Sequence, residues 1–177
     1  MFAAVARTVE GFGRIDGVIH GAAAPAGTEK EIRDTAPADC MVQFQAKVHG
    51  LPVLEKVLSG RDYKFCLMLS SLSSVLGGMA FAAYAASNIY VDTFVRKHNQ
   101  VHRQPWVSVN WDAWNRDAID PQNGGEALER ILSIGPVSQI AVSTTDLNAR
   151  LEQWVSFEDA PAAVTVEKAE GSVLHPR

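Results

Sequence analysis

Strand-like and helix-like segments alternate along most of the chain, and this alternation limits the possible folds more than any other feature of the sequence. Short apolar runs over residues 15–22, 65–70, 107–110 and 139–143 have the length and composition of strands. Segments with helical periodicity lie before, between and after them. Such alternation is typical of a parallel sheet with helices on both faces and right-handed crossovers. The sequence therefore predicts an α/β fold, with about four strands in a doubly wound parallel sheet.

The predicted helices are recognised by the residues at their ends. Glycines at 11 and 13 close a helix over residues 3–12, and Pro52 should break or kink a long helix over residues 38–58. A loop of small residues (SLSSVLGG, 71–78) precedes an Ala-rich helix over about 79–102.

Two further helices follow in the second half of the chain. Asn123 and Glu126 resemble a capping box, and the helix that they open carries Leu128, Ile131 and Leu132 on one face. Asp146 can cap a last short helix, LNARLEQWV. Residues 158–177 mix Pro, Gly and charge without periodicity, which predicts a linker or tail after a domain over residues 1–157.

Composition narrows the class of protein. With 47% hydrophobic and 20% charged residues the chain is typical of a globular protein, and its net charge of -4 provides no basic surplus for nucleic acid or anionic membrane. Cys40 and Cys66 stand singly, and no CxxC or clustered histidines suggest a disulfide framework or a metal site. No apolar stretch approaches the roughly 20 residues of a membrane span. We therefore expect a cytoplasmic protein without a metal.

Polar residues gather where the predicted strands end, which is where an open parallel sheet binds its ligands. Ser71 follows the second strand, while Tyr84 and Asn88 are four residues apart on the next helix and share a face. A serine and a tyrosine hydroxyl can hold one oxygen between them, which suits a carbonyl that is being reduced. A tyrosine has an ordinary pKa of about 10, so it needs a close, partly buried cation to transfer a proton near neutral pH.

These residues lie in segments that resemble the ketoreductase domains of modular polyketide synthases, members of the short-chain dehydrogenase/reductase superfamily. The resemblance runs from about residue 3 to 155 and is carried by GRIDGVIHGAA (13–23), AKVHG (46–50), FCLMLSSLSS (65–74), YAASNIYVDTFV (84–95) and VSVNWDAW (107–114). Most tyrosine-dependent reductases have a lysine four residues after the tyrosine, whereas in this family the lysine and asparagine exchange places. Lys47, in the K-V-x-G segment, and Asn88 fit the exchanged pattern.

The resemblance implies a role for each of four residues. Tyr84 gives its proton to the ketone oxygen while a hydride from NADPH reaches the carbon, and Ser71 hydrogen-bonds the same oxygen. Lys47 supplies the cation and holds the nicotinamide ribose, and Asn88 orients the lysine or a relay water. The residues expected to contact the cofactor are His20, Ala22, Ala23, Lys47, Ser70, Tyr84 and Asn110. The implied substrate is a 3-ketoacyl thioester on an acyl carrier protein.

The sequence lacks the G-x-G-x-x-G turn that binds cofactor phosphates. The nearest candidate, GFGRIDG (11–17), follows a helix and has Asp16 where the third glycine belongs, so it is interpreted as a turn. By the resemblance, the chain matches the C-terminal half of a ketoreductase without the first three strands, and its LHPR tail resembles a linker to a carrier-protein domain. A non-catalytic fragment or pseudo-ketoreductase with a structural role in a megasynthase is the alternative.

Several other residues leave a structural and a functional interpretation open. His20 is expected to pack at its strand end, Asp112 is either a site residue or a solvated turn residue, and three tryptophans (Trp106, Trp111 and Trp114) form either a stacking cluster or separate anchors. Members of the family that make the D-alcohol usually carry Leu-Asp-Asp where this chain has residues 25–27, Pro-Ala-Gly. Leu76 and Phe81 replace other markers of product stereochemistry, and the L-alcohol is favoured.

Overall fold

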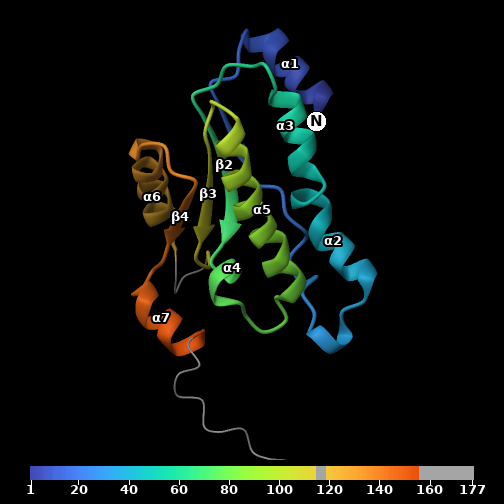
Figure 1. Ribbon diagram of the computed structural model, residues 1–177, viewed down its shortest axis with the longest axis vertical. Helices are drawn as coiled ribbons and strands as arrows, with labels where there is room; N and C mark the ends of the chain where they lie inside the picture. The colour runs from blue at the N-terminus through green and yellow to red at the C-terminus, as the bar shows by residue number, and fades with distance from the viewer. Residues whose placement is uncertain (115–118, 156–177) are drawn as a thin grey trace, which may run out of the picture.

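The computed structural model describes residues 1–114 and 119–155, and within them the predicted parallel sheet is confirmed. Its strands stand in the order β1-β2-β3-β4 and are all parallel. Figure 1 labels the last three, β2, β3 and β4, side by side. Their bounds are β1 Gly17–His20, β2 Phe65–Ser71, β3 Trp106–Trp111 and β4 Gln139–Val142. The helices are α1 Phe2–Phe12, α2 Pro37–Lys47, α3 Gly50–Leu58, α4 Ser73–Leu76, α5 Ala82–Val101, α6 Pro121–Ser133 and α7 Leu147–Trp154, with a 3-10 turn, η1, over Ile32–Asp34.

The two faces of the sheet build two separate cores, because successive strand residues point to opposite faces. On one face Cys66 and Met68 of β2 pack against α3 and α5, together with Trp106 of β3. On the other face Leu67 and Val109 pack against α6. Both central strands contribute to each core. Strand β2 has a continuous apolar run over Phe65–Leu69, as expected for a sheet covered on both sides, whereas β3 includes the buried polar residues Ser108 and Asn110.

The crossovers between the strands do not all have the same hand. Each strand adds to the same side of the preceding one, in the order β1-β2-β3-β4. The first two connections pass through helices on one face of the sheet, and the third passes through α6 on the other face. The β3–α6–β4 connection therefore has the opposite hand to the two before it. The prediction of right-handed crossovers throughout is wrong, because the apolar stripe of α6 covers the face that α3 and α5 leave open.

The predicted long helix over residues 38–58 is two helices, and Pro52 explains where it breaks. Helix α2 ends at Lys47, and α3 starts at Gly50. A proline ring clashes with the carbonyl four residues before it and cannot donate to it, and that carbonyl belongs to Val48. The break accordingly lies at residues 48–49, and Lys47 occupies the last position of α2.

Two local predictions need correction. The loop of small residues after β2 contains a one-turn helix, α4. The backbone N–H groups of Val75 and Leu76 donate hydrogen bonds to the carbonyl of Leu72 and hold this turn. Helix α6 starts at Pro121, ahead of the predicted Asn123, because the Asp120 side chain caps it by accepting from the Asn123 N–H. A proline in the first turn lacks only an N–H that would be unbonded there.

Other helix ends are as predicted. Gly13 closes α1 with a φ of 82°, and its N–H donates to the carbonyl of Val9. The Asp146 carboxylate caps α7 by accepting from the N–H of Ala149. The GFGRIDG segment is therefore the turn between α1 and β1, in agreement with its interpretation as turn chemistry.

The β1 side of the sheet is sparsely covered by the described residues. Strand β1 pairs only with β2, which leaves its other edge without a neighbouring strand in this part of the chain. Helix α1 buries none of its residues, and Phe12 at its end is 83% exposed. Ile19, in the middle of β1, is 51% exposed. Apolar side chains thus face outward next to an open strand edge.

No helix in the described ranges is long and apolar enough to cross a membrane. Both cysteines are free thiols, as predicted, and burial raises the pKa of the Cys66 thiol to about 12.

Candidate active site

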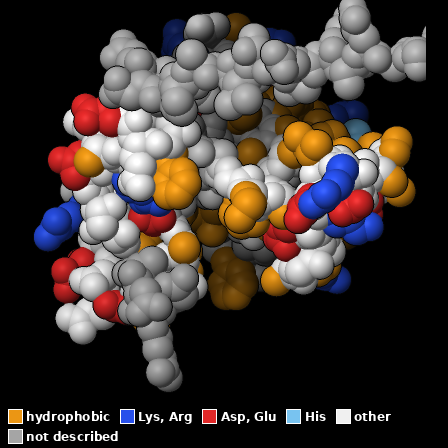
Figure 2. Space-filling model, turned by 90° about the horizontal axis from the view of Figure 1, so that it is seen from below, with side chains coloured by type: hydrophobic (Ala, Val, Ile, Leu, Met, Phe, Trp, Pro, Cys, Tyr) orange, Lys and Arg blue, Asp and Glu red, His pale blue; other side chains and the backbone are white. Residues whose placement is uncertain are grey.

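A cavity of about 580 Å³ opens where the strands end. Figure 2 looks onto this end of the molecule and shows hydrophobic side chains around a central hollow, with charged side chains farther out. The walls come from the segment after β1, the end of β2, α4, the start of α5, the segment after β3 and α7. The position agrees with the rule that open parallel sheets bind ligands beyond the carboxyl ends of their strands.

Ser71 and Tyr84 both line this cavity. Ser71 is the last residue of β2, and its hydroxyl oxygen accepts from the N–H of Ser73 at 3.1 Å. Tyr84 lies in the first turn of α5 and is partly exposed, and its ring meets that of Phe81 edge to face, with centroids 5.5 Å apart. The two hydroxyl-bearing side chains predicted to hold the substrate oxygen thus line the same cavity.

Lys47 reaches the same cavity from α2. Its ammonium donates to the Asn88 side-chain oxygen and to the carbonyl of Leu69, the latter at 3.0 Å. It also lies over the ring of Tyr84, 5.6 Å from the centroid. Lysine and tyrosine therefore meet although they come from different helices, and α2 packs along α5 to bring them together.

Asn88 connects the lysine to the tyrosine helix. Its side chain is fully buried, and its amide group donates to the backbone carbonyl of Tyr84 at 3.0 Å. With its nitrogen bonded in this way, its oxygen points to Lys47. The asparagine holds the lysine in place and does not itself line the cavity.

Burial changes the ionisation of Lys47. Desolvation lowers the pKa of its ammonium from 10.5 to about 8, and the Asp92 carboxylate opposes part of this shift. Desolvation also lowers the pKa of the neighbouring His20, and the Lys47 charge lowers it further. At neutral pH the cavity therefore has a lysine cation in its wall and an uncharged histidine behind it.

The predicted cofactor contacts are only partly brought together. Ala23 and Ser70 line the cavity together with Lys47 and Tyr84, whereas Ala22, His20 and Asn110 do not. His20 is buried beside Gly50, where a β-carbon would lie 3.7 Å from its Nε2. The interpretation of His20 as a packed residue at its strand end therefore fits, and its predicted contact with the cofactor does not follow from its position.

Asn110 belongs to a buried polar network below the cavity floor. Its amide donates to the Asp92 carboxylate and to the Ser74 hydroxyl, each at 2.7 Å. Asp92 also accepts from the hydroxyls of Ser74 and Ser108 and from the amide of Gln139. The network ties α5 to α4, β3 and β4 and occupies the Asn110 side chain, and the contact of Asn110 with a cofactor stays a prediction.

Sequence reasoning missed Asp92, although a signal for it exists. Tyr84, Asn88 and Asp92 follow at four-residue intervals and therefore share one face of α5. Two polar residues after the tyrosine, both buried, mark the face that points at the sheet.

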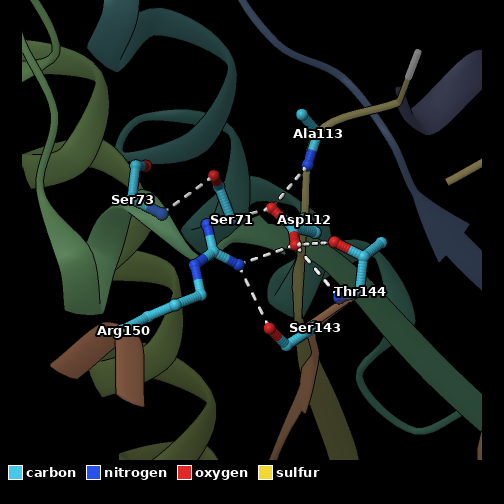
Figure 3. A network of polar contacts seen from close by, with 7 residues as sticks. All are labelled: Ser71, Ser73, Asp112, Ala113, Ser143, Thr144 and Arg150. Carbon is cyan, nitrogen blue, oxygen red and sulfur yellow. Dashed lines mark hydrogen bonds and ion pairs between the residues drawn. The ribbon is translucent and has the colours of Figure 1, made fainter. Parts of the chain in front are cut away.

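Asp112 is held in a second network at the cavity rim (Figure 3), and it is not a solvated turn residue. The Arg150 guanidinium of α7 donates to its carboxylate at 2.7 Å, and the N–H and hydroxyl of Thr144 donate to the same oxygen. Burial alone raises the pKa of Asp112, but these donors outweigh burial and lower it to about 2. Arg150 also donates to Ser143, so it joins the ends of β3 and β4 to α7. Arg150 carried no local sequence signal.

The three tryptophans do not form one cluster. Trp111 and Trp114 lie together with ring centroids 5.1 Å apart, and both line the cavity. Trp106 is buried in the core at the other end of β3, where it stacks on His98. Leu76 and Phe81, which stand at the positions of the stereochemical markers, also line the cavity.

Comparison with known proteins identifies the family. Residues 1–116 match the model of the KR domain family, and the chain belongs to this family.

The curated relatives are large polyketide synthases. The chain is 30% identical over 153 residues to erythronolide synthase EryA2 of Saccharopolyspora erythraea, an alignment that covers 78% of this chain and 4% of the relative. It is 32% identical over 169 residues to a phenolphthiocerol/phthiocerol polyketide synthase of Mycobacterium tuberculosis, covering 88% of this chain and 7% of that protein. The chain thus spans a small part of the relatives that it matches.

Solved structures agree on the fold. An N-terminal ketoreductase from the macrolactin assembly line superposes with a TM-score of 0.74 at 24% identity, covering 88% of this chain and 33% of the other. A short-chain dehydrogenase from Streptomyces avermitilis gives a TM-score of 0.69 at 14% identity, covering 86% and 68%. The sheet and its helices therefore have the Rossmann-like arrangement of short-chain dehydrogenases.

Proposed function

We propose that this chain is the catalytic half of a ketoreductase domain, which reduces a 3-ketoacyl thioester on an acyl carrier protein to the 3-hydroxyacyl thioester, with NADPH as hydride donor. One observation carries the proposal: the buried Lys47 of α2 is bonded to Asn88 and lies over the ring of Tyr84 at the wall of the cavity. The exchanged lysine and asparagine thus form the contacts that their proposed roles require. Membership in the KR domain family supports the same reaction.

Each of the four residues has a defined task in this reaction. Tyr84 transfers its proton to the ketone oxygen, and the Ser71 hydroxyl donates a hydrogen bond to that oxygen as negative charge develops on it. The Lys47 cation stabilises the tyrosinate that is left, and Asn88 keeps the ammonium next to the ring. NADPH supplies the hydride, which is the chemistry of the cofactor rather than of the protein.

The described residues fit one end of such a cofactor. Lys47 and the Tyr84 side chain stand at the cavity wall, where the lysine can hold a nicotinamide ribose, and small residues after β1 leave room for the ring. The described ranges contain no glycine-rich turn between a strand and a helix for the phosphates. We therefore propose that an N-terminal half of the domain, which pairs with the open edge of β1, supplies that turn.

The surroundings of the domain follow from the same proposal. Residues 1–157 form the partial ketoreductase domain, and residues 158–177, which lie outside the described ranges, connect it to a carrier-protein domain. The protein acts in the cytoplasm, where no nucleic acid or membrane takes part. The preference for the L-alcohol stays a prediction.

A non-catalytic fragment or pseudo-ketoreductase is the second candidate, favoured by the missing phosphate turn. The coding sequence upstream of Met1 separates the two most cheaply. A strand followed by T-G-G-x-G-x-x-G in that sequence favours the enzyme, and its absence there and in any partner chain favours the fragment.

Substitution of Tyr84 by phenylalanine tests the reaction itself. In the intact domain, Tyr84→Phe should lower the rate of NADPH-dependent reduction of a 3-ketoacyl thioester by about 100- to 10,000-fold, because it removes the general acid. Cofactor affinity, measured by fluorescence titration, should stay close to that of the wild type.

The matched control is Tyr90→Phe, which removes a hydroxyl from the same helix at a position packed against Phe94 and away from the cavity. Its rate should equal that of the wild type. Near-normal turnover by Tyr84→Phe would show that the catalytic assignment is wrong.

A further inference from the structure

Three potential metal ligands meet on the helices at the end of the sheet opposite the cavity. His98 lies near the end of α5, His102 directly follows that helix, and Glu55 belongs to α3. One Glu55 carboxylate oxygen lies 2.7 Å from His98 Nδ1 and 3.5 Å from His102 Nε2. The three ligand atoms lie within 4.8 Å of one another. We propose that this cluster, the Glu55–His98–His102 cluster, binds a zinc ion, independently of the proposed reductase activity.

His98 points one ring nitrogen at the Glu55 carboxylate and the other at the backbone. Its Nδ1 lies 2.7 Å from a carboxylate oxygen of Glu55, and its Nε2 lies 3.3 Å from the backbone carbonyl oxygen of Gln104. Because the His98 side chain is buried, these two contacts fix the direction in which Nδ1 points.

The same arrangement is typical of a histidine that binds a metal. Such histidines usually donate their second ring N–H to a carbonyl or carboxylate, which fixes the tautomer and the direction of the ring. His98 also stacks on the core residue Trp106 with ring centroids 4.2 Å apart, so this buried ligand is rigid before any ion arrives. The exposed His102 ring stacks on His98, also at 4.2 Å, and must turn out of this stack to bind the same ion, because the lone pairs of two stacked imidazoles cannot meet at one point.

The distances suit zinc once the side chains of Glu55 and His102 adjust. Zinc bonds to imidazole nitrogen and carboxylate oxygen are about 2.0–2.2 Å, so neighbouring ligand atoms in a tetrahedron are about 3.3 Å apart. The separation between Glu55 and His102 is already 3.5 Å. The Glu55–His98 pair must widen by about 0.6 Å to reach that tetrahedral spacing, which the partly exposed Glu55 side chain permits. Two imidazoles and a carboxylate form a donor set that zinc prefers.

A zinc ion can reach the cluster through a second cavity, of about 440 Å³, which all three residues line. It lies between α3, the segment before β2 and the segment after α5, and it leaves room for water as the fourth ligand. Sequence reasoning predicted no metal site because it did not consider that His98 and His102 are one helical turn apart. A bound ion would join α3 to the end of α5.

Isothermal titration of the metal-free full chain with zinc chloride tests the proposal. We expect one ion per chain, and His102→Ala and Glu55→Gln should each weaken binding by at least about tenfold, because even loss of an outer partner typically costs 10- to 100-fold. Both positions are partly exposed, so these variants should fold, which circular dichroism checks. His98 is left intact because it is buried in the core.

The control is His49→Ala, which removes an exposed histidine just before α3 and should leave zinc binding unchanged. As an independent measurement, zinc should raise the Tm of the wild type and of His49→Ala but not that of His102→Ala. The absence of saturable one-to-one binding would overturn the proposal, and so would equal affinity in all three variants.

Discussion

The buried ammonium of Lys47 should make the stability of the folded chain depend on pH in a direction opposite to that of a paired lysine. Its pKa is about 8 when folded and 10.5 when solvated, as in the unfolded chain. Between these values the unfolded chain keeps the proton and the folded chain has lost it, so unfolding takes up a proton. The free energy of unfolding therefore rises with pH across this window, by about 3 kcal/mol in total at 1.36 kcal/mol per pH unit.

The variant Lys47→Met isolates this effect, because methionine has a similar length and no charge. Between pH 7 and pH 9 the free energy of unfolding of the wild type should rise by about 1.4 kcal/mol relative to the variant. The pair should be compared by urea denaturation monitored by circular dichroism. Measurements stop at pH 9, because the Cys66 thiol, with its pKa raised from 9.0 to about 12, lowers stability above that pH in both proteins.

The control is Lys97→Met, which removes an exposed lysine from α5 and should follow the wild type at both pH values. If the difference between the wild type and Lys47→Met is the same at pH 7 and pH 9, Lys47 ionises as a solvated lysine. The argument that burial sets its charge would then be refuted.

Two further predictions concern the stability and the association of the chain. Asp92→Asn should lower the free energy of unfolding by about 3 kcal/mol. The Asp92 carboxylate accepts hydrogen bonds from two hydroxyls and an amide, and the side-chain N–H groups of asparagine would face these donors in place of an acceptor. A urea midpoint equal to that of the wild type would contradict this. The full chain should associate in a concentration-dependent way in size-exclusion chromatography with light scattering, because β1 offers an open edge beside the exposed Ile19. A monodisperse monomer at high concentration would show that this edge is protected.

The predictions that succeeded rest on local or nearly local signals. The apolar runs of the strands, Gly13 at the end of α1 and the cap of α7 by Asp146 each depend on a few consecutive residues. That Ser71 and Tyr84 line one cavity also followed from sequence, since strand ends and helix faces in a parallel sheet have fixed positions, while their roles stay predictions. Lys47 needed the family pattern, because nothing near it in sequence indicates that it will be buried.

What failed depends on contacts between distant segments. The Arg150–Asp112 pair joins residues 38 positions apart, and nothing in the sequence around either residue indicates that the other is its partner. Asn110 stands at a strand end like a ligand-binding residue, and nothing in the sequence indicated that its side chain donates to the buried Asp92. The hand of the β3–α6–β4 connection was missed because the apolar stripe of α6 does not reveal which face of the sheet it covers.

The meeting of Lys47 and Tyr84 depends on docking between α2 and α5, whereas a lysine four residues after the tyrosine would be in place as soon as one helix formed. In the proposed reaction, readiness for catalysis is therefore coupled to tertiary assembly. By the same proposal, a partly folded chain with α5 formed and α2 not yet docked would contain Tyr84 without its cation and would not transfer the proton. The exchange of lysine and asparagine thus makes the proposed proton transfer depend on the native packing of α2.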